Sequence, residues 1–271
     1  MAATNRKPVT RRNRPRQTKI VPLIVPRTRS RRQPSAMTVP TKWVKFIVAI
    51  FLLPICAVVS QTFFTAFARA AVAQRLWTGE EFWFFSLGAV LWLIAFFGLP
   101  RPVILYVFGH ELTHALWVWL MGGRVTRFRV GQDGGHIITD RTNFWIALAP
   151  YFFPLYSILA IALYGALSLF INVRPYGQLL YAIIGATWAF HSTFTCWMIL
   201  KNQTDLSDHG TLFSLILIYL MNLLLLTVML ILASPQITFV GFGRDLLTNL
   251  GGFAEWVGAV ANEFRHGAPS N

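Results

Sequence analysis

His110, Glu111 and His114 match the pattern H-E-x-x-H. On an α-helix, residues four apart share one face, so both imidazoles can reach one metal ion about 2.0–2.1 Å away. The carboxylate of Glu111 then lies beside that ion, where it can take a proton from a water molecule activated by the metal. The spacing therefore predicts two metal ligands, His110 and His114, and a catalytic Glu111 on a single helix.

These three residues lie inside the apolar run 103–121, which is long enough to span a hydrocarbon core. An ionisable side chain at the centre of a membrane helix costs about 2.5–3.5 kcal/mol on insertion scales, and such residues usually face the bundle interior and serve function. A structural polar cluster satisfied by neighbouring helices is the alternative. The metal-ligand spacing favours a functional site.

The rest of the chain is unusually apolar, with 55% hydrophobic and 13% charged residues. A soluble domain of this composition would need charged amphipathic helices around its core, and the sequence has almost none. We expect an all-α polytopic membrane protein with about six transmembrane helices and a small β-hairpin after the H-E-x-x-H helix. The other five expected spans are 46–68, 82–99, 144–170, 179–200 and 211–233.

The net charge of +14 comes almost wholly from the first 45 residues, which hold 13 Lys or Arg and no acidic residue. The remainder holds 11 basic and 10 acidic residues. Six prolines and repelling charges predict a disordered basic arm over 1–42. We expect it to be a cytoplasmic topology anchor that contacts anionic lipid. An organellar transit peptide would need an amphipathic helix, and no nucleic-acid partner is expected because interleaved aromatic residues are missing.

The C-terminal segment 234–271 has a different pattern. Apolar residues of 245–264 recur at helical spacing on one side. This predicts an amphipathic tail that lies in the membrane interface.

The sequence HELTHAL in a hydrophobic segment resembles the intramembrane zinc metalloproteases of the site-2 protease family, peptidase family M50. Gly122-Gly123, a β-hairpin over 125–139 and the proline-containing segment Ala147–Pro154 follow in the order that this family shows. The resemblance covers roughly residues 100–233 and implies one Zn²⁺ per chain, with membrane proteins or peptides as substrates. We expect the whole transmembrane metalloprotease-like domain to span 43–233.

In that family an aspartate from a later helix, in an N-P-D-G-like segment, is the third zinc ligand. The segment 202–210 reads Asn-Gln-Thr-Asp-Leu-Ser-Asp-His-Gly, which lacks the proline and the immediately following glycine. The resemblance implies Asp205 as the first choice and Asp208 as the second. His191, inside an expected span, is a further candidate, as a ligand or as a hydrogen-bond donor to the transition state. The alternative for His191 is a structural histidine satisfied by a neighbour.

The family's short sheet pairs with unwound substrate by strand addition. The resemblance implies this role for Val125, Phe128 and Val130, and the alternative is an ordinary connecting hairpin. We expect a zinc-dependent endopeptidase that hydrolyses peptide bonds of membrane-spanning substrates in the bacterial cytoplasmic membrane. The other two interpretations are a polytopic metal or proton transporter and an inactive protease-like binder of membrane proteins.

The expected topology contains a conflict. The family's site faces the cytosol, whereas three simple crossings from a cytosolic arm would place the hairpin on the outside. A re-entrant turn at Pro54 or within 99–102 would remove this conflict.

Overall fold

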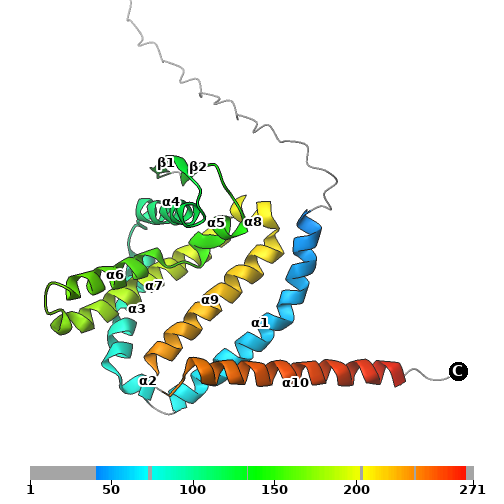
Figure 1. The fold of residues 1–271 in the computed structure, drawn as a ribbon. Coiled ribbons are helices and arrows are strands. Elements are labelled where there is room, and N and C mark those ends of the chain that lie inside the picture. Colours follow the sequence, from blue (N-terminus) through cyan, green and yellow to red (C-terminus); the bar gives the residue numbers. More distant parts are fainter. Residues whose placement is uncertain (1–40, 73–74, 133, 202–203, 235, 267–271) are drawn as a thin grey trace, which may run out of the picture. The chain divides into compact units, whose positions relative to one another are not determined.

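The structure is a computed structural model that describes residues 41–72, 75–132, 134–201, 204–234 and 236–266. It is mostly helical, with one two-stranded antiparallel sheet (Figure 1). Residues 1–40 of the predicted disordered arm lie outside the described residues. The longer helices are α1 Thr41–Val72, α3 Glu80–Gly98, α4 Val103–Leu120, α6 Leu155–Ser168, α7 Gly177–Ile199, α9 Thr211–Ala233 and α10 Phe239–His266. The short ones are α2 Arg75–Thr78, α5 Phe144–Leu148 and α8 Thr204–His209, with 3-10 turns at Ala149–Tyr151 and Arg174–Tyr176.

Four of the described helices, α1, α3, α4 and α9, are long and apolar enough to cross a membrane. A fifth span is possible if Phe144–Tyr151 and Leu155–Ser168, which bend by 79° at their junction, count as one. The expected six spans are therefore not confirmed. The run 144–170 bends where Pro154 precedes α6, because proline cannot donate the helical hydrogen bond. The run 179–200 forms α7, but its Thr, Ser and His side chains make it less apolar.

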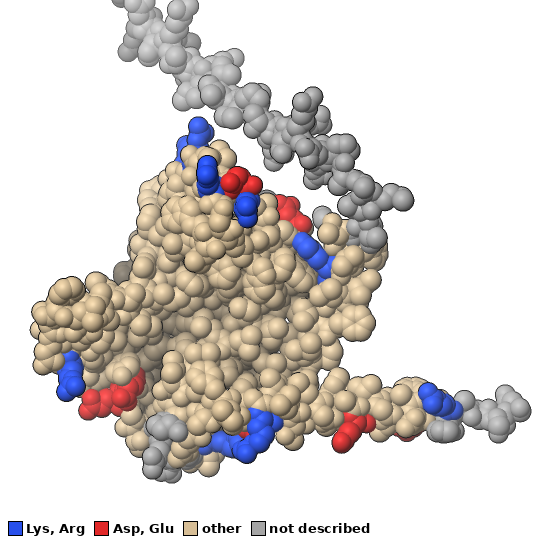
Figure 2. Space-filling model, in the orientation of Figure 1, with Lys and Arg blue, Asp and Glu red and all other residues tan. Residues whose placement is uncertain are grey.

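Charged side chains lie in two groups on the face drawn in Figure 2. One group lies over the hairpin and near the beginning of α1. The other lies toward the opposite end, along α10, near α2 and below the α6–α7 end, with a wide uncharged region between the two groups. Several long apolar helices and this uncharged region are compatible with an integral membrane protein.

Helices α3 and α7 run in the same direction with their backbones in contact. Gln178 donates a 2.7 Å hydrogen bond to Glu80 where both helices begin, and the rings of Phe96 and Phe194 are 5.5 Å apart near their ends. A Cβ atom at Gly88 would lie 1.9 Å from a backbone oxygen of α7. Glycine at this position is therefore what allows the two helices to approach so closely.

Helices α1 and α9 form a second pair that also runs in one direction. The Lys45 ammonium lies 5.9 Å from the Phe213 ring at their beginnings, and the hydroxyls of Ser60 and Tyr219 are 2.7 Å apart further along. Helix α1 continues through Pro54, so the re-entrant turn considered there is not formed.

Helix α4 joins these two pairs at one end of the bundle. Tyr106, in its first half, stacks on Phe194 near the end of α7. Trp117, near its own end, packs on a cluster that contains Ala49 and Phe213 near the beginnings of α1 and α9. Lys45 also contacts His209 of α8, which follows α7, at 2.6 Å between Nζ and Nδ1. Although α4 has the length and composition of a span, its contacts keep it at the end where α1 and α9 begin and α3 and α7 end.

The predicted hairpin is confirmed, with β1 Val125–Gly131 paired to β2 Gly134–Thr139. A register irregularity lies between Val125 and Arg127. Both strands pack against α4, the helix that carries the H-E-x-x-H motif.

The C-terminal segment forms one helix, α10, which is longer than the predicted 245–264. Its first part is attached to α1: Phe242 is buried, Asp245 pairs with Arg69, and Asn249 donates a 2.8 Å hydrogen bond to the Thr62 hydroxyl. Trp256 and other apolar side chains further along are exposed. The interfacial position of this helix stays a prediction.

Candidate metal centre

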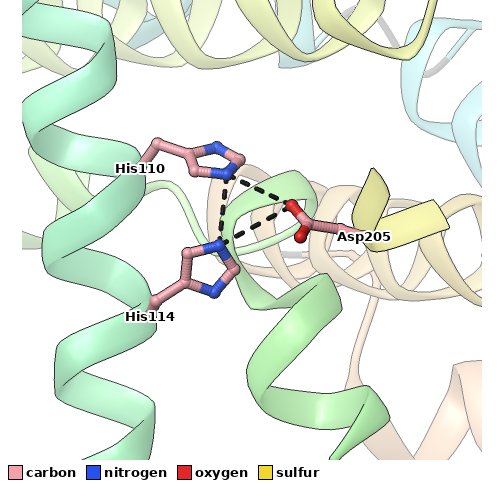
Figure 3. A group of neighbouring side chains, drawn as sticks. All are labelled: His110, His114 and Asp205. Atoms are coloured by element: carbon pink, nitrogen blue, oxygen red, sulfur yellow. Dashed lines mark hydrogen bonds and ion pairs between the residues drawn. The ribbon is translucent and has the colours of Figure 1, made fainter. Parts of the chain in front are cut away.

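His110, His114 and Asp205 converge on one point (Figure 3). The two histidines lie one turn apart on α4, because a separation of four residues places both on one helix face. Asp205 comes from α8, in the segment after α7. The Nε2 atoms of the histidines are 3.2 Å apart, and Oδ2 of Asp205 lies 3.5 Å from His110 Nε2 and 3.7 Å from His114 Nε2.

These separations fit a single small metal ion. A tetrahedral zinc site with ligand bonds of about 2.0–2.1 Å has ligand atoms about 3.3–3.4 Å apart. The three measured separations lie around this value, and two imidazoles with one carboxylate form a donor set that Zn²⁺ accepts readily. The three residues can therefore hold a metal by small side-chain adjustments.

The backbone fixes the ring orientation of His114. Its Nδ1 lies 2.8 Å from the carbonyl oxygen of Ile146, and this oxygen can only accept, so Nδ1 carries the proton. In the neutral ring Nε2 then holds the lone pair directed at the metal point. Ile146 is held in turn by Asn143, whose side chain accepts a 2.9 Å hydrogen bond from the Ile146 N–H at the start of α5.

Two tyrosines support the other ligands. The Tyr106 hydroxyl lies 3.1 Å from Nδ1 of His110, one helical turn before it. The Tyr151 hydroxyl donates a 3.1 Å hydrogen bond to Oδ2 of Asp205. Each ligand therefore has an outer partner, an arrangement typical of metal sites.

Asp205 is held in its ionised form. Burial by itself raises the pKa of this carboxyl, but when the rings of His110 and His114 are protonated, their hydrogen bonds and positive charge outweigh burial and hold the pKa well below its usual range. Asp208, the second choice of the sequence analysis, is not part of the metal-binding group.

Glu111 is buried, with 7% of its surface exposed, and lines the same cavity as the three metal ligands. The hairpin covers it: a Cβ atom at Gly135 would lie 2.6 Å from Cγ of Glu111 and 2.8 Å from the carbonyl oxygen of Arg129. Only glycine leaves room for the glutamate and the strand together. The hairpin therefore closes against the predicted catalytic residue.

The site opens into a cavity of about 570 Å³. One face of α4 from Val103 to His114 lines it, together with residues of β2, the end of α7 and Asp205. The cavity thus lies between the metal ligands and the strand nearest to them.

Val125, Phe128 and Val130 all lie on β1, whereas the lining of this cavity comes from β2. Val130 packs in a cluster with α4 and α7, and the Phe128 ring is 6.0 Å from that of Phe108. Their role in strand pairing stays a prediction.

His191 is buried but is not part of the metal-binding group. Its Nε2 has no hydrogen-bond partner among the described residues, and it lines a cavity of about 20 Å³ together with His110 and Tyr106. A volume of this size holds about one water molecule. The proposed role of His191 as a hydrogen-bond donor stays a prediction.

Sequence reasoning missed Tyr106, Tyr151, Ile146 and Gly135. Only Tyr106 had a local signal, because it lies four residues before His110 on the same helix face. Comparison with family models, curated proteins and solved structures found no match to this chain.

Proposed function

We propose that this chain is a zinc-dependent intramembrane endopeptidase that hydrolyses peptide bonds of membrane-spanning substrates. The observation that carries the proposal is the convergence of His110, His114 and Asp205 at separations of 3.2–3.7 Å, with Glu111 next to His110. The resemblance of the H-E-x-x-H segment to the site-2 protease family supports it.

Zinc would suit the two imidazoles and the carboxylate that could hold it, and the cavity beside them has room for a water molecule. When bound there, the metal lowers the pKa of that water and polarises the scissile carbonyl. Ile146, Tyr106 and Tyr151 keep the three ligands oriented.

In this proposal Glu111 is the residue that performs general acid–base catalysis. Its carboxylate accepts a proton from the attacking water as the new carbon–oxygen bond forms. It then returns that proton to the amide nitrogen as the carbon–nitrogen bond breaks. The reaction consumes one water molecule, whose atoms appear in the amine and the carboxylic acid that form.

A two-stranded sheet leaves backbone groups on the outer edge of each strand without a partner inside the sheet. We propose that a substrate, unwound at the scissile bond, pairs with the hairpin here. Strand β2 lines the cavity that contains Glu111, so its free edge supports this pairing better than that of β1.

The end of the bundle at which α1 begins is also the end that holds α8 and Asp205. The basic arm joins α1 at that end, and basic segments favour the cytosolic side. We therefore propose a site that opens toward the cytosol of a bacterial cytoplasmic membrane, with the arm on anionic lipid. Because α4 lies at one end of the bundle, its residues can face the cytosol without a re-entrant turn in 43–102. This position supports the proposed orientation of the site.

The test compares wild-type chain with Glu111→Gln, both purified in detergent. Zinc content is measured by elemental mass spectrometry, and cleavage of single-span peptides in vesicles is measured by mass spectrometry. Glu111→Gln should keep its zinc and lose activity by about 10²–10⁴-fold, the usual contribution of a general base. Glu255→Gln on α10 is the matched control and should retain both.

Three outcomes would contradict the proposal. If Glu111→Gln cleaved peptides at the wild-type rate, the proposed mechanism would be wrong. A wild-type chain that cuts no peptide but moves zinc or protons into vesicles would support the transporter, and one that only binds peptides would support the inactive binder.

A further inference from the structure

Lys201 places a positive charge in the wall of the reaction cavity. It lies just after α7 and lines the same cavity as His110, Glu111 and Asp205. Its ammonium is 3.6 Å from the centre of the Trp197 ring, a strong cation–π geometry. The indole therefore limits the directions in which this long side chain can point.

Arg101 adds a second cation to the same ring. Its guanidinium lies 5.2 Å from the Trp197 ring and 4.6 Å from that of Phe96. Within the described residues, the structure gives neither Arg101 nor Lys201 an ion pair with a carboxylate. Two cations held by aromatic rings and not neutralised by an acid form a ready site for an anionic group.

The position of Arg101 just before α4 sets its distance to the reaction centre. Arg101 precedes α4 by two residues, and Val103, the first residue of α4, lines the cavity. His110 lies seven residues further, which is about 10 Å along a helix axis. An extended peptide covers that length with about three residues.

We propose that the cavity selects substrates with an acidic side chain about three residues from the scissile bond, held by Lys201 with Arg101 beside it. This inference rests on the proposed function and adds a substrate class to it. A Lys that merely anchors a helix in the headgroup region would not need to line the cavity that holds Glu111 and Asp205, as Lys201 does.

The test measures binding, so that it does not depend on turnover. Zinc-loaded full chain with Glu111→Gln is placed in nanodiscs of neutral phosphatidylcholine. Fluorescent single-span peptides that carry either Asp or Asn at one position, scanned along the segment, are titrated against it. At one position Asp should bind at least about tenfold more tightly than Asn, the size of one charge-assisted hydrogen bond.

Variants assign the effect to the two cations. Adding Lys201→Gln should abolish the preference for Asp, Lys201→Glu should shift it to a peptide with Lys at that position, and Lys201→Arg should keep it. Arg101→Gln should weaken the preference, whereas Arg174→Gln, far along the chain in a 3-10 turn, should leave it unchanged.

Equal binding of Asp and Asn peptides at every position, or no binding of either, would overturn the inference. A preference for Asp combined with no cleavage by the wild-type chain would overturn the proposed function and leave the acidic-group site standing. If Lys201→Gln alters only the retention of phosphatidylglycerol in mixed nanodiscs, the pair is a lipid headgroup site and the inference is wrong.

Discussion

The phenol of Tyr151 donates a 3.1 Å hydrogen bond to the Oδ2 atom of Asp205, and this is the same oxygen that faces His110 and His114. Tyr151 lies in the 3-10 turn between α5 and α6, and its backbone oxygen accepts a 2.9 Å hydrogen bond from Asn222 of α9. The turn is thereby held between α9 and the carboxylate. It fixes the position of a ligand that is carried by the short helix α8.

Replacing Tyr151 by Phe should loosen Asp205 without removing a ligand. We expect zinc affinity to fall by about 10–100-fold, as is typical when an outer partner of a metal ligand is removed. Zinc affinity is measured by competition with a chelator of known strength. Tyr164→Phe, which removes a hydroxyl bound to the Val173 carbonyl, is the matched control. If both variants lower thermal stability alike and neither changes zinc affinity, Tyr151 has only a structural role.

Variants of Asp205 and Asp208 should show which of the two aspartates is the third metal ligand. Asp205→Asn should lower zinc affinity by more than about 100-fold, because a direct ligand contributes more than an outer partner does. Asp208→Asn should retain zinc, since Asp208 is not part of the metal-binding group. Zinc content after dialysis, measured on both proteins, decides between them. If the two variants retained zinc equally, Asp205 would not be a metal ligand.

Gly135 should be required for the position of Glu111. A Cβ atom there would meet Cγ of Glu111 at 2.6 Å and the Arg129 carbonyl at 2.8 Å, so Gly135→Ala must move the glutamate or the strand. A displacement of this kind should cut peptide cleavage by about 10²-fold while zinc content stays unchanged. Gly131→Ala in β1 is the control, because its nearest atom would be 3.4 Å away. Full activity of Gly135→Ala would show that the hairpin does not position Glu111.

The contact between α3 and α7 should fail when Gly88 gains a side chain. Gly88→Ala would place Cβ 1.9 Å from the Ala182 carbonyl oxygen, and a fixed backbone atom cannot give way as a flexible side chain can. We expect a loss of about 1–3 kcal/mol or more in stability, measured by thermal unfolding in detergent. Gly98→Ala, at the end of the same helix with no atom within 4 Å, should be nearly neutral. Equal unfolding temperatures for the two variants would contradict the close helix contact.

Much of the local structure could be predicted from the sequence. The placement of His110, Glu111 and His114 on one turn of helix follows from helical periodicity, which depends only on spacing along the chain. The hairpin at 125–139 and the helical character of each apolar run were predicted for the same reason. The number of spans was not, because a run such as 144–170 can be uniformly apolar and still bend at a proline.

The tertiary structure decided which distant residues meet. Nothing in the segment 202–210 distinguishes Asp205 from Asp208 except a partial motif, whereas the packing of Tyr151 against α8 brings Asp205 to the histidines. The same holds for Lys201, whose place in the cavity wall depends on the packing of α7 against α3 and on the stacking of Tyr106 of α4 on Phe194 of α7. Hydropathy likewise reports that α4 is apolar, but only its contacts with both helix pairs place it at one end of the bundle. Local patterns act over one or two turns of chain, while these relationships depend on side-chain packing between segments tens of residues apart.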